Sequence, residues 1–153
     1  MTKTSSGDEN GNFLAGSSWF ERDYVLFKKL DLLINGSDRI GEEQLLEQRK
    51  KFFPKYPDND FENITKNLRL FKKTSFLSII KRDIDSKATL EENLSSLSSL
   101  AEICIQSALV DSMKYYANKL NMMPESYRRK SELFIIAMGK LGGRELNASS
   151  DID

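Results

Sequence analysis

The sequence contains no histidine and a single cysteine, Cys104, among its 153 residues. The lack of histidine excludes a histidine metal site, a histidine general base and a Ser-His-Asp triad. One cysteine cannot build a disulfide framework within the chain, which fits a reducing compartment. We therefore expect a cytoplasmic protein with one packed core, for which the length is sufficient.

Net charge and long hydrophobic runs are lacking as well. Lys plus Arg and Asp plus Glu both number 23, so the formal net charge is zero. Bulk charge therefore indicates neither a nucleic-acid nor a membrane partner. The sequence has no run of about 18 apolar residues that would predict a transmembrane helix. The amino-terminal residues are polar and do not resemble a secretory signal.

Apolar residues recur at helical spacing after a polar beginning. Residues 1–17 are mostly small and polar, and we expect a disordered tail there. Asn35-Gly36, Pro54, Pro57 and the capping box Thr89-x-x-Glu92 divide the next hundred residues. The pattern predicts four helices: about Ser18 to Ile34, about Ser37 to Phe53, Asp58 or Asp60 to about Ile80, and Thr89 to Asn121.

The fourth predicted helix has the clearest apolar face. We expect the members of this face to be buried together: Leu94, Leu97, Ala101, Cys104 and Ala108. The serines at 95, 96, 98 and 99 fall mostly outside that face, which predicts a polar surface. On the third helix, Lys66, Arg69 and Lys73 form a basic face that is either solvated or in contact with phosphate.

The stretch from Leu133 to Asp153 combines an apolar run, glycines and paired carboxylates. Leu133 to Met138 is typical of a short buried strand, although a core helix also fits so short a run. Glycines at 139, 142 and 143 favour the strand, because they permit a tight turn and close backbone approach to a ligand. Asp151 and Asp153 are two residues apart, so on a second strand both carboxylates would lie on one face.

This combination predicts a site that handles phosphate and metal. Backbone N–H groups at a glycine turn that leads into a helix favour an anion. Two carboxylates supply the hard oxygen ligands that Mg²⁺ prefers. Taken separately, an Asp-x-Asp pair is more often a surface feature and a Gly-Gly pair is usually only a turn.

The string from Gly139 to Asn147, followed by Ser149 to Asp153, resembles a known motif. It is similar to the nucleotidyltransferase motif of the bacterial bifunctional glutamine synthetase adenylyltransferase/adenylyl-removing enzymes, which are polymerase-β-like nucleotidyltransferases. Ala148 departs from the family, which often has a larger residue there. The resemblance extends over about residues 60–153 and includes helical segments that precede the motif.

The resemblance implies a mainly α chain. A helical region over 18–130 would lead into the first strand or strands of a polymerase-β-like α/β fold, which begins at 131. The chain stops inside the motif at Asp153, and the family's third carboxylate comes from a later strand. We therefore expect a truncated amino-terminal fragment that is inactive alone.

The resemblance also implies the reaction. The family's amino-terminal unit removes AMP from a modified tyrosine of glutamine synthetase by phosphorolysis, and its carboxy-terminal unit adds AMP from ATP. The position of the motif after Met1 and the spelling of residues 147–153 resemble the first unit. Asp151 and Asp153 would be catalytic and hold Mg²⁺, while Gly142, Gly143 and Ser150 would contact phosphate or nucleotide.

The implied partners are glutamine synthetase, ATP or ADP, phosphate and PII-type nitrogen regulatory proteins. An alternative is a helical interaction module or remnant with no chemistry in this chain. The sequence downstream of Asp153 distinguishes the two. A further apolar strand and a later carboxylate favour the enzyme, whereas a stop codon favours a remnant.

Overall fold

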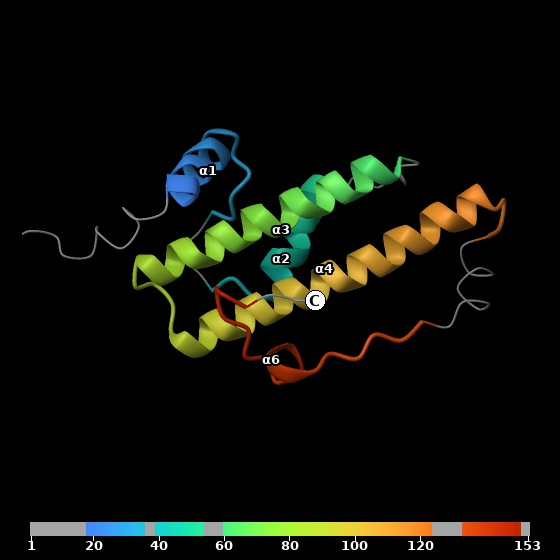
Figure 1. Ribbon diagram of the computed structural model, residues 1–153. Helices are drawn as coiled ribbons and strands as arrows, with labels where there is room; N and C mark the ends of the chain where they lie inside the picture. The colour runs from blue at the N-terminus through green and yellow to red at the C-terminus, as the bar shows by residue number, and fades with distance from the viewer. Residues whose placement is uncertain (1–17, 36–38, 54–59, 124–132, 151–153) are drawn as a thin grey trace, which may run out of the picture.

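The computed structural model describes residues 18–35, 39–53, 60–123 and 133–150 (Figure 1). These parts contain five helices: α1 (Ser18–Lys29), α2 (Glu42–Phe52), α3 (Phe61–Ile84), α4 (Leu90–Lys119) and the single-turn α6 (Gly139–Gly142). The described residues contain no β-strand. The prediction of a helical bundle between residues 18 and 123 is confirmed. The predicted tail at 1–17 lies outside the described residues.

Two long helices, α3 and α4, lie side by side and form the body of the molecule (Figure 1). Helix α2 packs against both of them, and α1 packs against α3. The predicted capping box of the fourth helix is confirmed for Thr89, whose hydroxyl accepts a hydrogen bond from the Glu92 N–H at 3.2 Å, while the Glu92 carboxylate accepts from Arg82 Nη2 at 3.1 Å. The Asp60 carboxylate caps α3 in the same way, with the Glu62 N–H at 3.0 Å.

The helices α1, α3, α4 and α6 end in one common way. The second residue after each helix end has a left-handed backbone, with φ between 51° and 58°; the four are Asp31, Ser86, Asn121 and Arg144. In each case the N–H of this residue bonds back three residues, and the N–H of the next bonds back five. This is the Schellman motif, which satisfies the last carbonyl groups of a helix.

This motif corrects the predicted end of the first helix. The periodicity and Asn35-Gly36 predicted a helix to about Ile34, but α1 ends at Lys29. The Leu32 N–H donates to the Phe27 carbonyl at 3.0 Å, so the chain folds back at Asp31. Leu33, which follows the helix, then packs against Phe20 and Phe27 of α1 and Leu77 of α3. These four buried residues form a small second core.

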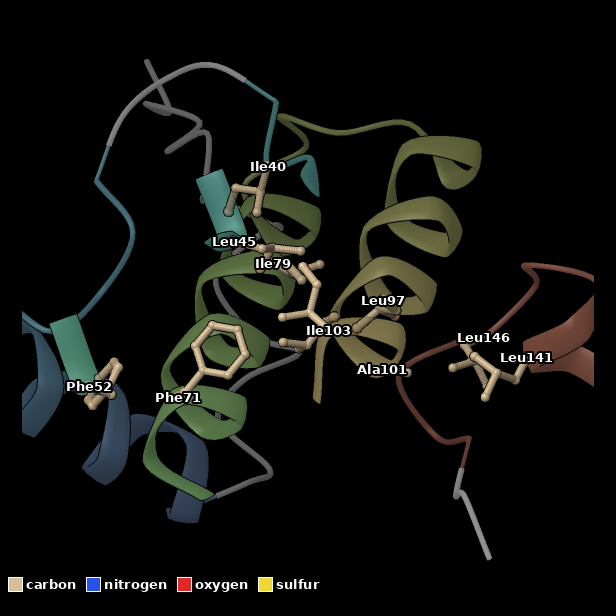
Figure 2. Close-up of a cluster of buried hydrophobic side chains, with 11 residues drawn as sticks. Ile40, Leu45, Phe52, Phe71, Ile79, Leu97, Ala101, Ile103, Leu141 and Leu146 are labelled. Atoms are coloured by element: carbon tan, nitrogen blue, oxygen red, sulfur yellow. The ribbon is translucent and has the colours of Figure 1, made fainter. Parts of the chain in front are cut away.

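The main core lies where α2, α3, α4 and the α6 region meet. Its buried members come from all four: Ile40, Leu45, Phe52, Phe71, Ile79, Leu97, Leu100, Ala101, Ile103, Leu141 and Leu146. Figure 2 labels all of them except Leu100. Residues that are distant in sequence therefore share one apolar cluster. Through Leu141 and Leu146, the cluster ties the glycine-containing turn to the helices.

The predicted buried face of α4 is confirmed in part. Leu97 and Ala101 are buried, whereas Leu94, Cys104 and Ala108 are only half-buried. The prediction that the serines lie outside the seam is wrong for Ser96, Ser98 and Ser99, which are buried. Helix α4 is covered both by α2 and α3 and by the α6 region, and small side chains permit this close approach. The hydroxyls of Ser96 and Ser98 donate to backbone carbonyls, as when Ser98 Oγ donates to the Leu94 carbonyl at 2.8 Å.

The prediction of a buried strand at Leu133 to Met138 is wrong for this structure. These residues lead into α6 without helix or strand structure (Figure 1). Phe134, Ile136 and Met138 are more than four-fifths exposed, at 81%, 83% and 82%. A strand needs a hydrogen-bonded neighbour, and no described segment pairs with this one.

Candidate functional site

The glycines at 139 and 142 are required by the backbone of the turn. Gly139 has φ of +56°, a conformation that side chains disfavour. At Gly142 a Cβ atom would lie 2.6 Å from the carbonyl oxygen of Ala137. A Cβ at Gly143 would meet only ordinary contacts, the nearest at 3.5 Å from the Gly139 carbonyl oxygen. The fold thus explains the first two glycines but not the third.

The N–H groups of Gly142 and Gly143 already have partners. They donate to the carbonyl oxygens of Met138 at 3.1 Å and of Gly139 at 2.9 Å, which closes the single turn of α6. A phosphate contacting these two N–H groups would therefore share or displace these hydrogen bonds. The predicted phosphate contact at both glycines stays a prediction.

We expect Gly142→Ala and Gly143→Ala to differ. Alanine at 142 forces the backbone away from the Ala137 carbonyl, which should destabilise the turn by about 1–3 kcal/mol. Alanine at 143 fits, because Gly143 has an ordinary right-handed backbone with φ of −80°. Amide hydrogen exchange over residues 141–147 measures the difference, with roughly 5- to 100-fold faster exchange expected only in Gly142→Ala. Equal exchange in the two variants would contradict the assignment of Gly142 as the close approach.

Asn147 organises the segment that leads to Asp151. Its side-chain oxygen accepts from the N–H of Ser149 at 3.2 Å and from the hydroxyls of Ser149 at 3.0 Å and Ser150 at 2.9 Å. The Asn147 N–H donates to Ser150 Oγ at 3.1 Å, and the Ser150 N–H donates to the Asn147 carbonyl at 3.0 Å. Ser150, predicted to contact phosphate, therefore closes a tight local turn. Asn147 has no predicted role beyond the motif, although asparagine and serine are both turn-forming residues.

The glycine turn is attached to α4 by an arginine and two serines. Arg144 Nη1 lies 2.6 Å and 2.7 Å from the two carboxylate oxygens of Glu102, and Nη2 donates to Ser99 Oγ at 2.8 Å. The Leu146 N–H donates to Ser98 Oγ at 3.3 Å. Leu141 and Leu146 add apolar contact, and Figure 2 shows both beside Leu97 and Ala101. Ser98, Ser99, Glu102 and Arg144 meet across more than forty residues of sequence, so no local pattern indicated their roles.

The Arg144–Glu102 ion pair lies at the surface. Its side chains are 48% and 45% exposed, and ion pairs of this exposure contribute only about 0–1 kcal/mol to stability. Arg144 Nη1 nevertheless contacts Glu102 while Nη2 bonds to Ser99, so the guanidinium is held to α4 at two residues. Its main effect is therefore on where the turn lies.

A groove of about 420 Å³ lies between α2 and α4, and Ser99 and Glu102 are in its lining. Arg49, which also lines the groove, binds α4 further along. Its Nε donates to Ser107 Oγ at 2.6 Å and its Nη2 to Asp111 Oδ2 at 2.9 Å. Helix α2 and the glycine turn thus contact α4 in the same way. In each case an arginine binds one serine and one carboxylate of α4.

The predicted metal ligands Asp151 and Asp153 lie outside the described residues. Within residues 18–35, 39–53, 60–123 and 133–150, no three His, Cys, Asp or Glu side chains gather as a metal site would require. Burial raises the pKa of the Cys104 thiol to about 11, despite the opposing charges of Lys72 and Arg49. The thiol is therefore protonated near neutral pH, which makes it a poor metal ligand. The Mg²⁺ ligands that the sequence predicts, the carboxylates of Asp151 and Asp153, stay a prediction.

Comparison with known proteins identifies the family. The sequence profile described as glutamate-ammonia ligase adenylyltransferase matches residues 23–153, which include part of α1, all of α2, α3, α4 and α6, and the whole glycine motif. The chain belongs to this family. The glutamate-ammonia ligase adenylyltransferase match also contains Asp151 and Asp153, although the structure does not describe them.

Curated relatives carry the name bifunctional glutamine synthetase adenylyltransferase/adenylyl-removing enzyme. The protein from Thioalkalivibrio sulfidiphilus is 37% identical over 90 residues, or 59% of this chain and 9% of its own length. That from Chromobacterium violaceum is 38% identical over 92 residues, or 60% of this chain and 10% of its own. The protein from Nitrosococcus oceani is 40% identical over 87 residues, which is 56% of this chain and 9% of its own length.

The aligned region of this chain thus spans about a tenth of these relatives. No solved structure matches the chain. No helix among the described residues has the length and apolar character needed to span a bilayer.

Proposed function

We propose that this chain is part of the adenylyl-removing unit of a bifunctional glutamine synthetase adenylyltransferase/adenylyl-removing enzyme. The observation that carries the proposal is the family match, which continues through the motif to Asp153. The relatives' printed name includes both adenylyl transfer and adenylyl removal. The resemblance of residues 147–153 to the motif of the removing unit supports that half.

The reaction would be phosphorolysis of an adenylylated tyrosine. A phosphate oxygen attacks the adenylyl phosphorus, the bond from phosphorus to the tyrosine oxygen breaks, and that oxygen takes up a proton. The products are ADP and the free tyrosine of glutamine synthetase. The same proposal includes two further partners of the longer polypeptide. These are PII-type regulators, and ATP as the source of AMP in the opposite reaction.

The chain's own residues would position the reacting groups. Asp151 and Asp153 would hold Mg²⁺, which when bound supplies charge stabilisation for phosphoryl transfer. The tight turn from Asn147 to Ser150 sets the direction in which the chain enters Asp151. Gly142 and Gly143 would contact phosphate, which would share or displace the hydrogen bonds that their N–H groups make to Met138 and Gly139.

The exposed apolar segment from Leu133 to Met138 fits the same proposal. Its exposure is unfavourable in water, whereas a buried sheet strand would remove these side chains from solvent. We propose that it becomes the first strand of the nucleotidyltransferase sheet in a polypeptide of the relatives' length. There it would have neighbouring strands to pair with.

The test uses adenylylated glutamine synthetase as substrate. A polypeptide of the relatives' length that contains this chain should remove the adenylyl group only when phosphate and Mg²⁺ are both present. Mass spectrometry of the modified tyrosine peptide measures the loss. We expect the 153-residue chain alone to remove none, because it lacks the later carboxylate. No removal by the longer polypeptide would contradict the proposed function and leave the helical interaction module as the alternative.

A further inference from the structure

Arg144 differs from the other residues that end helices in this structure. The left-handed positions after α1, α3 and α4 hold Asp31, Ser86 and Asn121, short polar residues. Of these, Asn and Asp are the side chains that best tolerate this backbone. The same position after α6 holds Arg144, with φ of 58°. Glycine is the usual choice there, and two glycines stand immediately before it.

The Arg144 side chain makes contacts that a glycine cannot. Its guanidinium binds both carboxylate oxygens of Glu102 and the hydroxyl of Ser99, on the first half of α4. Two residues later, the Leu146 N–H donates to Ser98. Both sides of the turn from Gly142 to Leu146 are thereby fixed to one rigid helix.

We propose that Arg144, through Glu102 and Ser99, is a positioning residue that holds the glycine turn against α4 in the orientation that the reaction needs. The inference rests on the proposed function. A disfavoured backbone at a candidate site is retained when the side chain has a use there. The surface exposure of the ion pair makes stability a poor explanation of that use, since exposed pairs contribute little to it.

The decisive variant is Arg144→Gly. If Arg144 only ends the helix, glycine should serve as well or better, because it relieves the left-handed backbone. If Arg144 positions the turn, glycine should loosen it. Asn121→Gly is the matched control, because Asn121 has the same motif position and a φ of 51° at the end of α4, away from the turn. Glu102→Gln removes the negative charge that pairs with the Arg144 guanidinium and leaves the backbone of the turn unchanged.

Two measurements are needed, one of which does not depend on the activity. In the 153-residue chain, exchange of the amides of residues 142–146 should rise about 10-fold in Arg144→Gly and less in Glu102→Gln. It should not change in Asn121→Gly. Melting temperatures of all three should stay within about 4 °C of the parent.

In the longer polypeptide, kcat for adenylyl removal should fall about 10- to 100-fold in Arg144→Gly, as expected for a misplaced reacting group. KM for adenylylated glutamine synthetase should not change. The double variant Arg144→Glu with Glu102→Arg restores an ion pair and should recover most of the kcat lost in Arg144→Glu alone.

Unchanged exchange at the turn, or parental kcat in Arg144→Gly, would overturn the inference. An inactive parent polypeptide would instead contradict the proposed function. In that case the exchange measurement alone decides whether Arg144 holds the turn: faster exchange in Arg144→Gly supports the attachment, and unchanged exchange overturns it.

Discussion

Asp151→Asn and Asp153→Asn should each lower the rate of adenylyl removal by the longer polypeptide, by about 10²- to 10³-fold or more. Each replacement removes one anionic oxygen ligand of the proposed Mg²⁺ site. Metal-based charge stabilisation in such reactions amounts to several kcal/mol, and each 1.4 kcal/mol is a factor of ten in rate. The initial rate of phosphate-dependent loss of the adenylyl group measures the effect.

Asp31→Asn is the control for this replacement. Asp31 is an exposed residue at the end of α1, and asparagine also tolerates its left-handed backbone. We expect its rate to equal that of the parent. Full activity in both the Asp151 and the Asp153 variant would show that these carboxylates do not hold the metal. Higher Mg²⁺ should partly restore a variant that retains weak metal binding.

The second large effect is on stability. Phe71 on α3 is fully buried, with 0% exposure, in the cluster that joins α2, α3, α4 and the glycine turn (Figure 2). Truncating a buried phenylalanine to alanine lowers the free energy of unfolding by about 3–5 kcal/mol. Urea denaturation of the 153-residue chain should show this loss in Phe71→Ala.

Phe61 provides a comparison on the same helix. It is 41% exposed and contacts the rings of Tyr115 and Tyr116, at centroid distances of 5.2 Å and 6.3 Å. We expect Phe61→Ala to lower the free energy of unfolding by about 1 kcal/mol, the usual scale for an aromatic pair near the surface. Equal losses in the two variants would contradict the assignment of Phe71 to the centre of the core.

The long helices could be predicted because their determinants are local. The apolar period of α3 and the Thr89 cap of α4 are visible in short windows of sequence, and the structure confirms them. The end of α1 was missed because Asp31 competes with Asn35-Gly36, and both are acceptable stop signals. Packing of Leu33 against α3 decides between them, and that contact is not local.

Burial of the α4 serines and exposure of Leu133 to Met138 were missed for one shared reason. Whether a residue is buried depends on what lies against it, and composition does not reveal this. Ser98 and Ser99 receive the turn that begins some forty residues later, through Leu146 and Arg144. The apolar segment is exposed because no described strand lies beside it. In the same way, nothing in the spacing of Glu102 and Arg144 indicates that they meet.

The central claim is that this chain belongs to a unit that removes the adenylyl group by phosphorolysis. The most direct test supplies radiolabelled inorganic phosphate and Mg²⁺ to the longer polypeptide with adenylylated glutamine synthetase, and then separates the nucleotide products. Phosphorolysis predicts that the label appears in the β-phosphate of ADP, in amounts equal to the tyrosine that is freed. Release of unlabelled AMP, or freed tyrosine without labelled ADP, would contradict it.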